Sequence, residues 1–353
     1  MNSRERYLAA IDLKPVDRLP LDFTGVEEVI ARLKAHFKVD DIFGALKLDC
    51  PGHIGPEYIG PAMPALPKGE SENFWGMRYR MTGNDSGAYN EQVVFPLAGA
   101  KTIDDLKKFR WPDARWFDCS KMAAQARIIR ETRAVKCGYM CSFYMHNQVR
   151  GLEQSLIDPL EDPEFTHELL NRISDFMLSY HRRMFEACPG LIDLCEVTDD
   201  LGSQTGPMMS LSMFREFYAS HLKKYINLCQ EFNIKVMHHD CGSCRIFLPD
   251  LVEMGINMLD PIQWTCPGMD MKELKAEFGK KICFHGAVEN QKILPFGTPE
   301  DVRAEVRHCI DSLAPDKTGY ILTACHALQS NTSVENIIAM YDEARKYGDW
   351  SKR

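Results

Sequence analysis

The chain has 353 residues, of which 45% are hydrophobic and 26% are charged, a composition typical of a large soluble globular protein. The formal net charge of −8 excludes a basic field for nucleic acid, and no apolar run reaches the roughly 18–20 residues of a membrane span. We therefore expect no nucleic-acid or membrane partner, and the charged N-terminal residues do not have the pattern of a signal peptide.

The first hundred residues contain few regular elements. The predicted elements are a helix over residues 2–12, a short strand over 19–23 and a helix over 26–47. Residues 50–99 are rich in glycine, proline and aromatic residues, and predict irregular structure with short strands at 77–81 and 91–96. Because long segments of this kind often form lids or binding surfaces, we expect this one to lie over one mouth of the domain.

From residue 102 onwards, helical and strand patterns alternate. The predicted strands cover residues 134–141, 191–197, 234–237, 256–259, 281–284 and 320–324. The predicted helices cover residues 102–109, 119–131, 145–157, 163–187, 212–231, 245–254, 270–278, 299–313 and 334–347. Alternation of this length predicts an α/β fold with a parallel sheet, and about eight strands favour a single (β/α)8 TIM barrel. No repeat or linker divides the chain, so we expect residues 1–353 to form one domain.

A histidine and a cysteine two residues apart follow the strand that begins at Ile234. Positions i and i+2 of a strand share one face, so His239 and Cys241 can bind the same ion. Gly242 and Ser243 then turn the chain into a loop, which leaves the pair at the strand's carboxyl end. Because α/β barrels build their sites at these strand ends, the pair predicts one part of a metal site.

A third ligand is expected from the last predicted strand, which ends in Cys325 and His326. In a closed barrel this strand can reach the ion that His239 and Cys241 bind. Neighbouring residues of a strand face opposite ways, so we expect either Cys325 or His326, and not both, to be the ligand. Three protein ligands would leave a fourth position open, as catalytic zinc sites do.

Other polar residues follow the predicted strand ends. The candidates for a catalytic role are Asp199, Asp200 and Gln263, and the candidates for substrate binding are Glu196, Tyr144, His146 and His285. Carboxylates at such positions orient ligand histidines or act as acid and base. The alternative for each of them is a helix cap or a solvated rim.

Several common chemistries are not indicated. The sequence contains no GxGxxG after a strand, no P-loop and no GxSxG elbow, so nothing predicts dinucleotide, nucleotide or serine-hydrolase chemistry. The 13 cysteines have no disulfide-type framework, which is typical of a reducing cytoplasm. We therefore expect a cytoplasmic protein in which most thiols serve as small core residues.

The motifs together resemble the uroporphyrinogen decarboxylase superfamily. The matching stretches are residues 199–207, 239–243, 247–251, 261–263, 294–299 and 334–337. The resemblance covers nearly the whole chain, is weakest between residues 50 and 130, and implies a (β/α)8 barrel. The decarboxylases proper carry an arginine-rich N-terminal motif that binds porphyrinogen carboxylates. Here residues 19–25 contain no arginine pair, which makes that reaction a poor match.

The other branch of this superfamily consists of zinc-dependent methyltransferases that work with corrinoid proteins. These include the methylcobamide:coenzyme M methyltransferases and the methyltransferases of O-demethylase systems. Their zinc ligands are a His-x-Cys pair, which His239 and Cys241 match, and a cysteine near the last strand. Counted back from Asn331, that cysteine falls on His326, and Cys325 lies one residue earlier.

The resemblance implies a zinc-dependent methyltransferase that moves a methyl group between a small methoxy, methylamine or thiol compound and a corrinoid (cobalamin) on a partner protein. It also implies a possible homodimer. The first alternative is a metal-free decarboxylase that uses Asp199, Asp200 and His326. The second is a non-enzymatic corrinoid-partner or assembly protein built on the same barrel.

Overall fold

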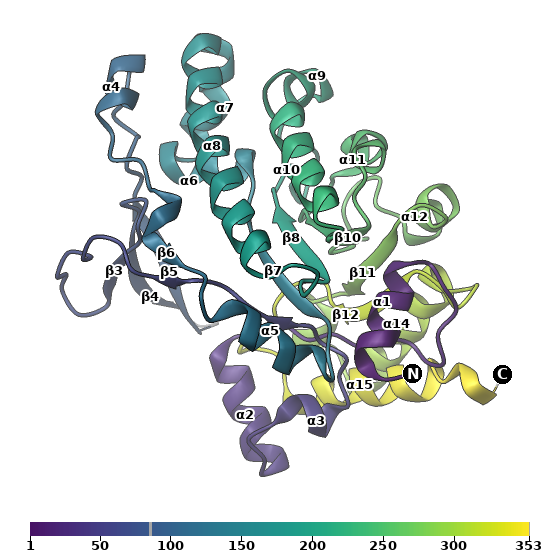
Figure 1. Ribbon diagram of the computed structural model, residues 1–353. Helices are drawn as coiled ribbons and strands as arrows, with labels where there is room; N and C mark the ends of the chain where they lie inside the picture. The colour runs from purple at the N-terminus through teal and green to yellow at the C-terminus, as the bar shows by residue number, and fades with distance from the viewer. Residues whose placement is uncertain (85–86, 353) are drawn as a thin grey trace.

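A curled parallel sheet forms the centre of the computed structural model, which describes residues 1–84 and 87–352. The strand order is β1-β7-β8-β9-β10-β11-β12, and each neighbouring pair is parallel. The bounds are β1 Gly52–His53, β7 Val135–Met140, β8 Leu194–Thr198, β9 Lys235–His239, β10 Met258–Asp260, β11 Cys283–Val288 and β12 Tyr320–Ala324. Figure 1 shows helices α8, α10, α11 and α12 in succession along the outside of this sheet. This architecture confirms the predicted barrel-type α/β fold.

The two ends of the sheet meet through the segment that was predicted as the first strand. Leu21 forms a parallel bridge with Leu322 of β12, and its carbonyl accepts a bond from the Asp49 N–H at 2.7 Å. The predicted strand over residues 19–23 is therefore reduced to a single bridge. The first strand of the sheet, β1, lies inside residues 50–99, which were predicted to be irregular. Two residues are too few to produce a sequence period, so this strand escaped prediction.

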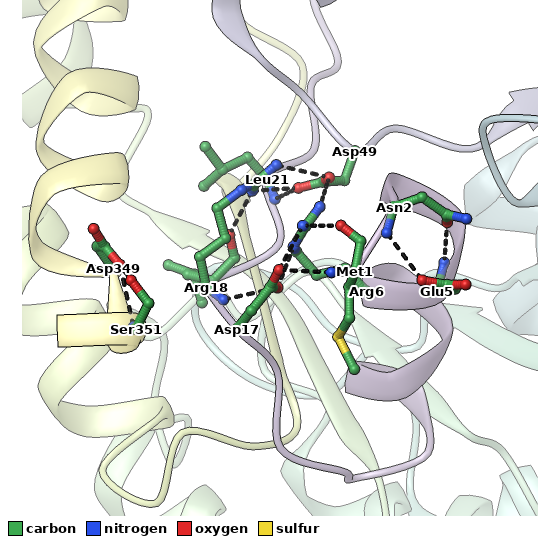
Figure 2. Close-up of polar contacts among 11 residues, drawn as sticks. Met1, Asn2, Glu5, Arg6, Asp17, Arg18, Leu21, Asp49, Asp349 and Ser351 are labelled. Atoms are coloured by element: carbon green, nitrogen blue, oxygen red, sulfur yellow. Dashed lines mark hydrogen bonds and ion pairs between the residues drawn. The ribbon is translucent and has the colours of Figure 1, made fainter. Parts of the chain in front are cut away.

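A buried carboxylate holds this closure together (Figure 2). Asp49, which has no exposed surface, accepts hydrogen bonds from Arg6 at 2.8 Å, Arg18 at 2.7 Å and the Leu21 N–H at 3.1 Å. Arg6 lies on α1 (Ser3–Ile11) and also contacts Asp17 at 2.7 Å. One carboxylate thus connects the first helix, the bridge segment and the residues before β1.

Two predicted helices are each divided in the structure. The helix predicted over residues 26–47 consists of α2 (Glu27–Phe37) and α3 (Ile42–Leu46), because Lys38 adopts the left-handed conformation that ends a helix. The helix predicted over 145–157 consists of α6 (Ser142–Arg150) and α7 (Leu152–Glu161), separated at Gly151, whose φ is +86°.

The remaining helices occur close to predicted positions, except that α13 was not predicted and that α9 and α10 share the helix predicted over residues 212–231. Their bounds are α4 Ile103–Lys108, α5 Met122–Arg130, α8 Pro163–Ala187, α9 Leu211–Met213, α10 Ala219–Glu231, α11 Leu248–Met254, α12 Met271–Phe278, α13 Ile293–Phe296, α14 Pro299–Leu313 and α15 Val334–Tyr347. A π-helical turn, η2 (Phe214–Tyr218), joins α9 to α10, and short 3-10 turns occupy η1 Ala114–Trp116, η3 Arg245–Phe247 and η4 Trp350–Lys352. None of the helices in the described part of the chain is both long and apolar enough to cross a membrane.

Small antiparallel sheets occupy the segment between the bridge region and α5. The pair β2 (Glu57–Tyr58) and β6 (Phe117–Asp118) forms one of them. The strands β3 (Glu70–Glu72), β4 (Arg78–Asn84) and β5 (Gly87–Val94) form the other, which projects beside the barrel in Figure 1. Tyr89 donates to Gln329 at 2.9 Å, so β5 lies next to the loop that follows β12.

Candidate metal centre and cavity

The functional side chains gather at the carboxyl ends of the barrel strands. His239 on β9 lies in register with Asp260 on β10 and with Thr198 on β8. A cavity of about 340 Å³ opens here. Its polar lining includes Asp22, Lys136, Glu196, His239, Asp260, His285 and His326. The cavity therefore joins residues from the first bridge segment to the last strand.

Three potential metal ligands stand together at the rim of this cavity. The ligand atoms of His239, Cys241 and His326 all lie within 4.8 Å of one another. His239 Nε2 is 3.5 Å from Cys241 Sγ, which is the same-face contact that the i, i+2 spacing predicts. The turn after Cys241 depends on Gly242, whose φ is +83° and where a Cβ would lie 2.6 Å from backbone atoms of Ser203.

A chain of hydrogen bonds runs from this cluster into the barrel. His239 Nδ1 contacts Asp260 at 2.6 Å, and the other oxygen of Asp260 contacts His285 Nδ1 at 2.5 Å. His285 Nε2 contacts Asp22 at 3.1 Å, and Tyr7 donates to the same carboxylate at 2.9 Å. Because Asp260 takes the Nδ1 side of His239, the Nε2 atom remains available on the side of Cys241 and His326.

The charges in this chain reinforce one another. Burial alone would lower the pKa of His239, but the negative charge of Asp260 outweighs it and raises the pKa well above its usual range. For His285, burial is likewise outweighed by Asp260 and Asp22, and the pKa rises to about 9. The pKa of Asp260 is correspondingly lowered by the two imidazoles, against the effect of its burial. The histidine–carboxylate chain is thus strongly polarised.

The rim cluster fits the requirements of a zinc ion. Two imidazoles and one thiol are a donor set that zinc accepts, and a carboxylate behind a ligand histidine is a common support of such sites. Burial raises the pKa of the Cys241 thiol, although His239 partly offsets this effect. Binding of a metal would therefore displace a proton from sulfur.

The side chains of His326 and Cys325, the two alternatives for the third ligand, point in different directions. His326 stands in the cluster, whereas the Cys325 thiol is directed to the carbonyl of Ile262 at 3.6 Å. Cys325 still lines the cavity, and burial raises the pKa of its thiol well above the usual range. The geometry therefore favours His326 over Cys325.

The predicted catalytic residues surround the Cys241 loop. Asp200 accepts the Cys241 N–H at 3.1 Å and lies 4.0 Å from His239 Nε2. Gln263 accepts the Gly242 N–H at 2.9 Å, so both residues hold the backbone of this loop. Asp199 is fully buried, where burial raises its pKa to about 7, and it accepts the N–H of Tyr144 at 2.9 Å.

The predicted substrate-binding residues divide into two groups. Glu196 and His285 line the cavity. Tyr144 lies at the start of α6 beside Asp199, and burial raises the pKa of its phenol. His146 is fully buried and contacts Tyr218 at 3.0 Å and Asp158 at 3.2 Å. His146 therefore belongs to the packing between α6 and its neighbouring helices. It lies away from the cavity, because its side of α6 faces those helices.

Several polar cavity residues are not among the predicted site residues, and Asp22, Lys136 and Asp260 are the charged ones. Asp260 follows a predicted strand and Asp22 lies near the end of another, so the strand-end rule that selected Gln263 applies to them as well. Lys136 lies inside the apolar run of β7, where its charge is the one local feature that distinguishes it. Only the structure shows that this side chain faces the cavity.

Comparison with known proteins places these residues in a family context. A profile of the uroporphyrinogen decarboxylase family matches residues 134–347. A methylated-thiol–coenzyme M methyltransferase from Methanosarcina mazei is 24% identical over 201 residues, which cover 56% of this chain and 49% of the relative. A uroporphyrinogen decarboxylase from Ruthia magnifica subsp. Calyptogena magnifica is 19% identical over 191 residues, with coverages of 53% and 51%. The matched region thus spans about half the length of these curated relatives.

A solved structure extends the likeness to the whole fold. A methyltransferase from Methanosarcina mazei superimposes with a TM-score of 0.66 at 19% sequence identity. The match covers 98% of this chain and 99% of that structure, including the N-terminal part that the family profile does not reach. The two chains therefore share one fold.

Proposed function

The chain belongs to the uroporphyrinogen decarboxylase family, and on this premise we propose that it is a zinc-dependent methyltransferase. It moves a methyl group between a small methylated compound and a corrinoid carried by a partner protein. The observation that carries this proposal is the cluster of His239, Cys241 and His326 at the mouth of the barrel. The likeness to a methylated-thiol–coenzyme M methyltransferase supports a thiol among the candidate substrates, beside methoxy and methylamine compounds.

The residues around the cluster each have a task in this reaction. A bound zinc ion supplies Lewis-acid chemistry to the atom that gives or receives the methyl group. Asp260 holds the proton on Nδ1 of His239, so that Nε2 is free to ligate. Asp200 holds the Cys241 amide and thereby positions the thiol. The cavity orients the substrate so that its methyl group meets the corrinoid in line.

The charge of the cavity favours methyl transfer over porphyrinogen decarboxylation. Among the described lining residues, Lys136 is the one lysine or arginine, and it faces the carboxylates Asp22, Glu196 and Asp260. A substrate with many carboxylates requires several cationic partners, preferably arginines with their two parallel donors. This lining suits a small substrate with at most one acidic group.

An anaerobic assay with zinc-loaded protein, cob(I)alamin and a panel of methyl thioethers, methoxy compounds and methylamines tests the proposal. The cobalt(I) electron pair forms the new Co–C bond, and the leaving sulfur, oxygen or nitrogen keeps the electrons of its broken bond and takes a proton. We expect loss of the cob(I)alamin spectrum and formation of methylcobalamin with at least one donor. Failure of every donor, together with failure of methylcobalamin to methylate any thiol, would contradict it.

Replacement of Asp260 by asparagine should weaken zinc binding. The asparagine no longer stabilises the polarised imidazole of His239, and loss of such a supporting carboxylate typically lowers metal affinity about 10–100-fold. Competition with a chromophoric chelator measures the change. The matched control is Asp158→Asn, which removes a carboxylate beside the buried His146 outside the cavity and should leave zinc affinity unchanged. Equal affinities in the two variants would refute the role of Asp260.

A further inference from the structure

Lys136 forms part of the lining of the cavity. Its neighbours in β7, Val135 and Cys137, are completely buried. The Lys136 side chain lines the cavity, and 24% of its surface is exposed. Its ammonium group contacts Glu196 at 2.7 Å. Glu196 precedes Thr198, the β8 residue in register with His239, by two positions. The Glu196 carboxylate also accepts the Thr198 hydroxyl at 3.3 Å, so the ion pair is connected to the carboxyl end of β8.

The other cavity carboxylates already have partners. Asp22 accepts bonds from Tyr7 and His285, and Asp260 lies between His239 and His285. A lysine ammonium group has three N–H donors, and the described residues provide Lys136 with one acceptor in hydrogen-bond contact, Glu196. Two donors therefore remain for a ligand.

The Lys136 side chain also keeps its charge inside the barrel. Burial alone would lower the pKa of Lys136, but the negative charges of Glu196 and Asp22 outweigh this effect and raise it. A charged ammonium group that is partly withdrawn from water and has two donors without a hydrogen-bond acceptor can bind an anion through charge-assisted hydrogen bonds. Because β8 lies between β7 and β9, Lys136 and His239 occupy different parts of the cavity wall, and this contact is separate from the place where a methyl group would react.

We infer that Lys136 determines substrate specificity by binding a carboxylate group at the end of the substrate remote from the transferred methyl group. This assignment rests on the proposed function and narrows its substrate class to small methylated carboxylic acids. Glu196 competes with that carboxylate for the ammonium group, so it limits the affinity for anions and holds Lys136 in place when the cavity is empty. A substrate with a positively charged group at that end would instead be repelled by the Lys136 ammonium group.

Calorimetric titration of zinc-loaded protein with three matched probes tests this inference. The probes are 3-(methylthio)propionate, its neutral methyl ester and the cationic 3-(methylthio)propylamine. We expect the carboxylate to bind the wild-type protein at least about tenfold more tightly than the ester. In Lys136→Met this preference should disappear, while the affinity for the ester changes less than about twofold.

Two further variants test the same preference independently if Lys136→Met is unstable. The double variant Lys136→Met with Glu196→Gln removes both buried charges, which preserves folding better than an unpaired carboxylate, and it should also lose the preference. Glu196→Gln alone frees the ammonium group and should tighten carboxylate binding about 3–10-fold. Thermal unfolding of each variant verifies that it is folded.

The inference is overturned if the wild-type protein does not bind the carboxylate, or binds it no better than the ester or the amine. It is also overturned if both charge-removing variants retain the preference. Binding that follows the expected pattern without methyl transfer to cob(I)alamin would instead refute the proposed function alone. Methyl transfer that is equally efficient from neutral and carboxylate donors would refute the role of Lys136 alone.

Discussion

Protein with Cys241 replaced by alanine should contain less than about a tenth of an equivalent of zinc when it is purified without added metal. Because zinc is lost, the rate of methyl transfer by this variant should fall at least about 100-fold. Cys241 is the thiol of the rim cluster, and its loss leaves His239 and His326 as two neutral donors, which bind zinc far more weakly than a set that includes a thiolate. Elemental analysis and the cob(I)alamin assay measure the two effects.

Other cysteines provide matched controls for this result. Cys244→Ala removes a fully buried thiol three residues away, whose sulfur contacts Met269, and it should retain zinc. His326→Ala should lose zinc and Cys325→Ala should retain it, because the geometry favours His326. The opposite pattern would assign the third ligand to Cys325. Retention of zinc and activity by Cys241→Ala would leave the proposed metal centre without support.

Replacement of Asp49 by alanine should lower the free energy of unfolding by about 3–5 kcal/mol. The change leaves the guanidinium groups of Arg6 and Arg18 facing a site without its carboxylate, and it removes the acceptor of the Leu21 N–H. All of these groups lie where the last strand meets the first bridge segment. Urea unfolding monitored by circular dichroism measures the loss.

Asp17→Ala is the control for this stability effect. Asp17 also contacts Arg6, but 38% of its side chain is exposed, so water replaces much of the lost interaction. Its removal should cost no more than about 1 kcal/mol. Similar losses in Asp17→Ala and Asp49→Ala would mean that the barrel closure does not depend on the buried carboxylate.

The alternating architecture and the first half of the rim cluster can be predicted from local sequence patterns. The strand β12 is a largely apolar run between two helical patterns, and such local patterns are visible in a single sequence. The same alternation predicted that His239, the last residue of β9, and Cys241 point the same way, and their side chains are 3.5 Å apart although Cys241 lies beyond the strand. The division of two predicted helices at Lys38 and Gly151 escaped this rule, because a single backbone conformation interrupts an otherwise helical pattern.

The closure of the barrel and the lining of its cavity depend on contacts between distant parts of the chain. The Leu21 bridge, the Asp49 network and the contact of Asp22 with His285 join residues that are far apart in the chain. The geometry that favours His326 over Cys325 depends on side-chain directions after β12, and the pairing of Lys136 with Glu196 depends on the register of two strands. Such contacts have no period along the sequence, because they form only when the parallel strands are brought side by side.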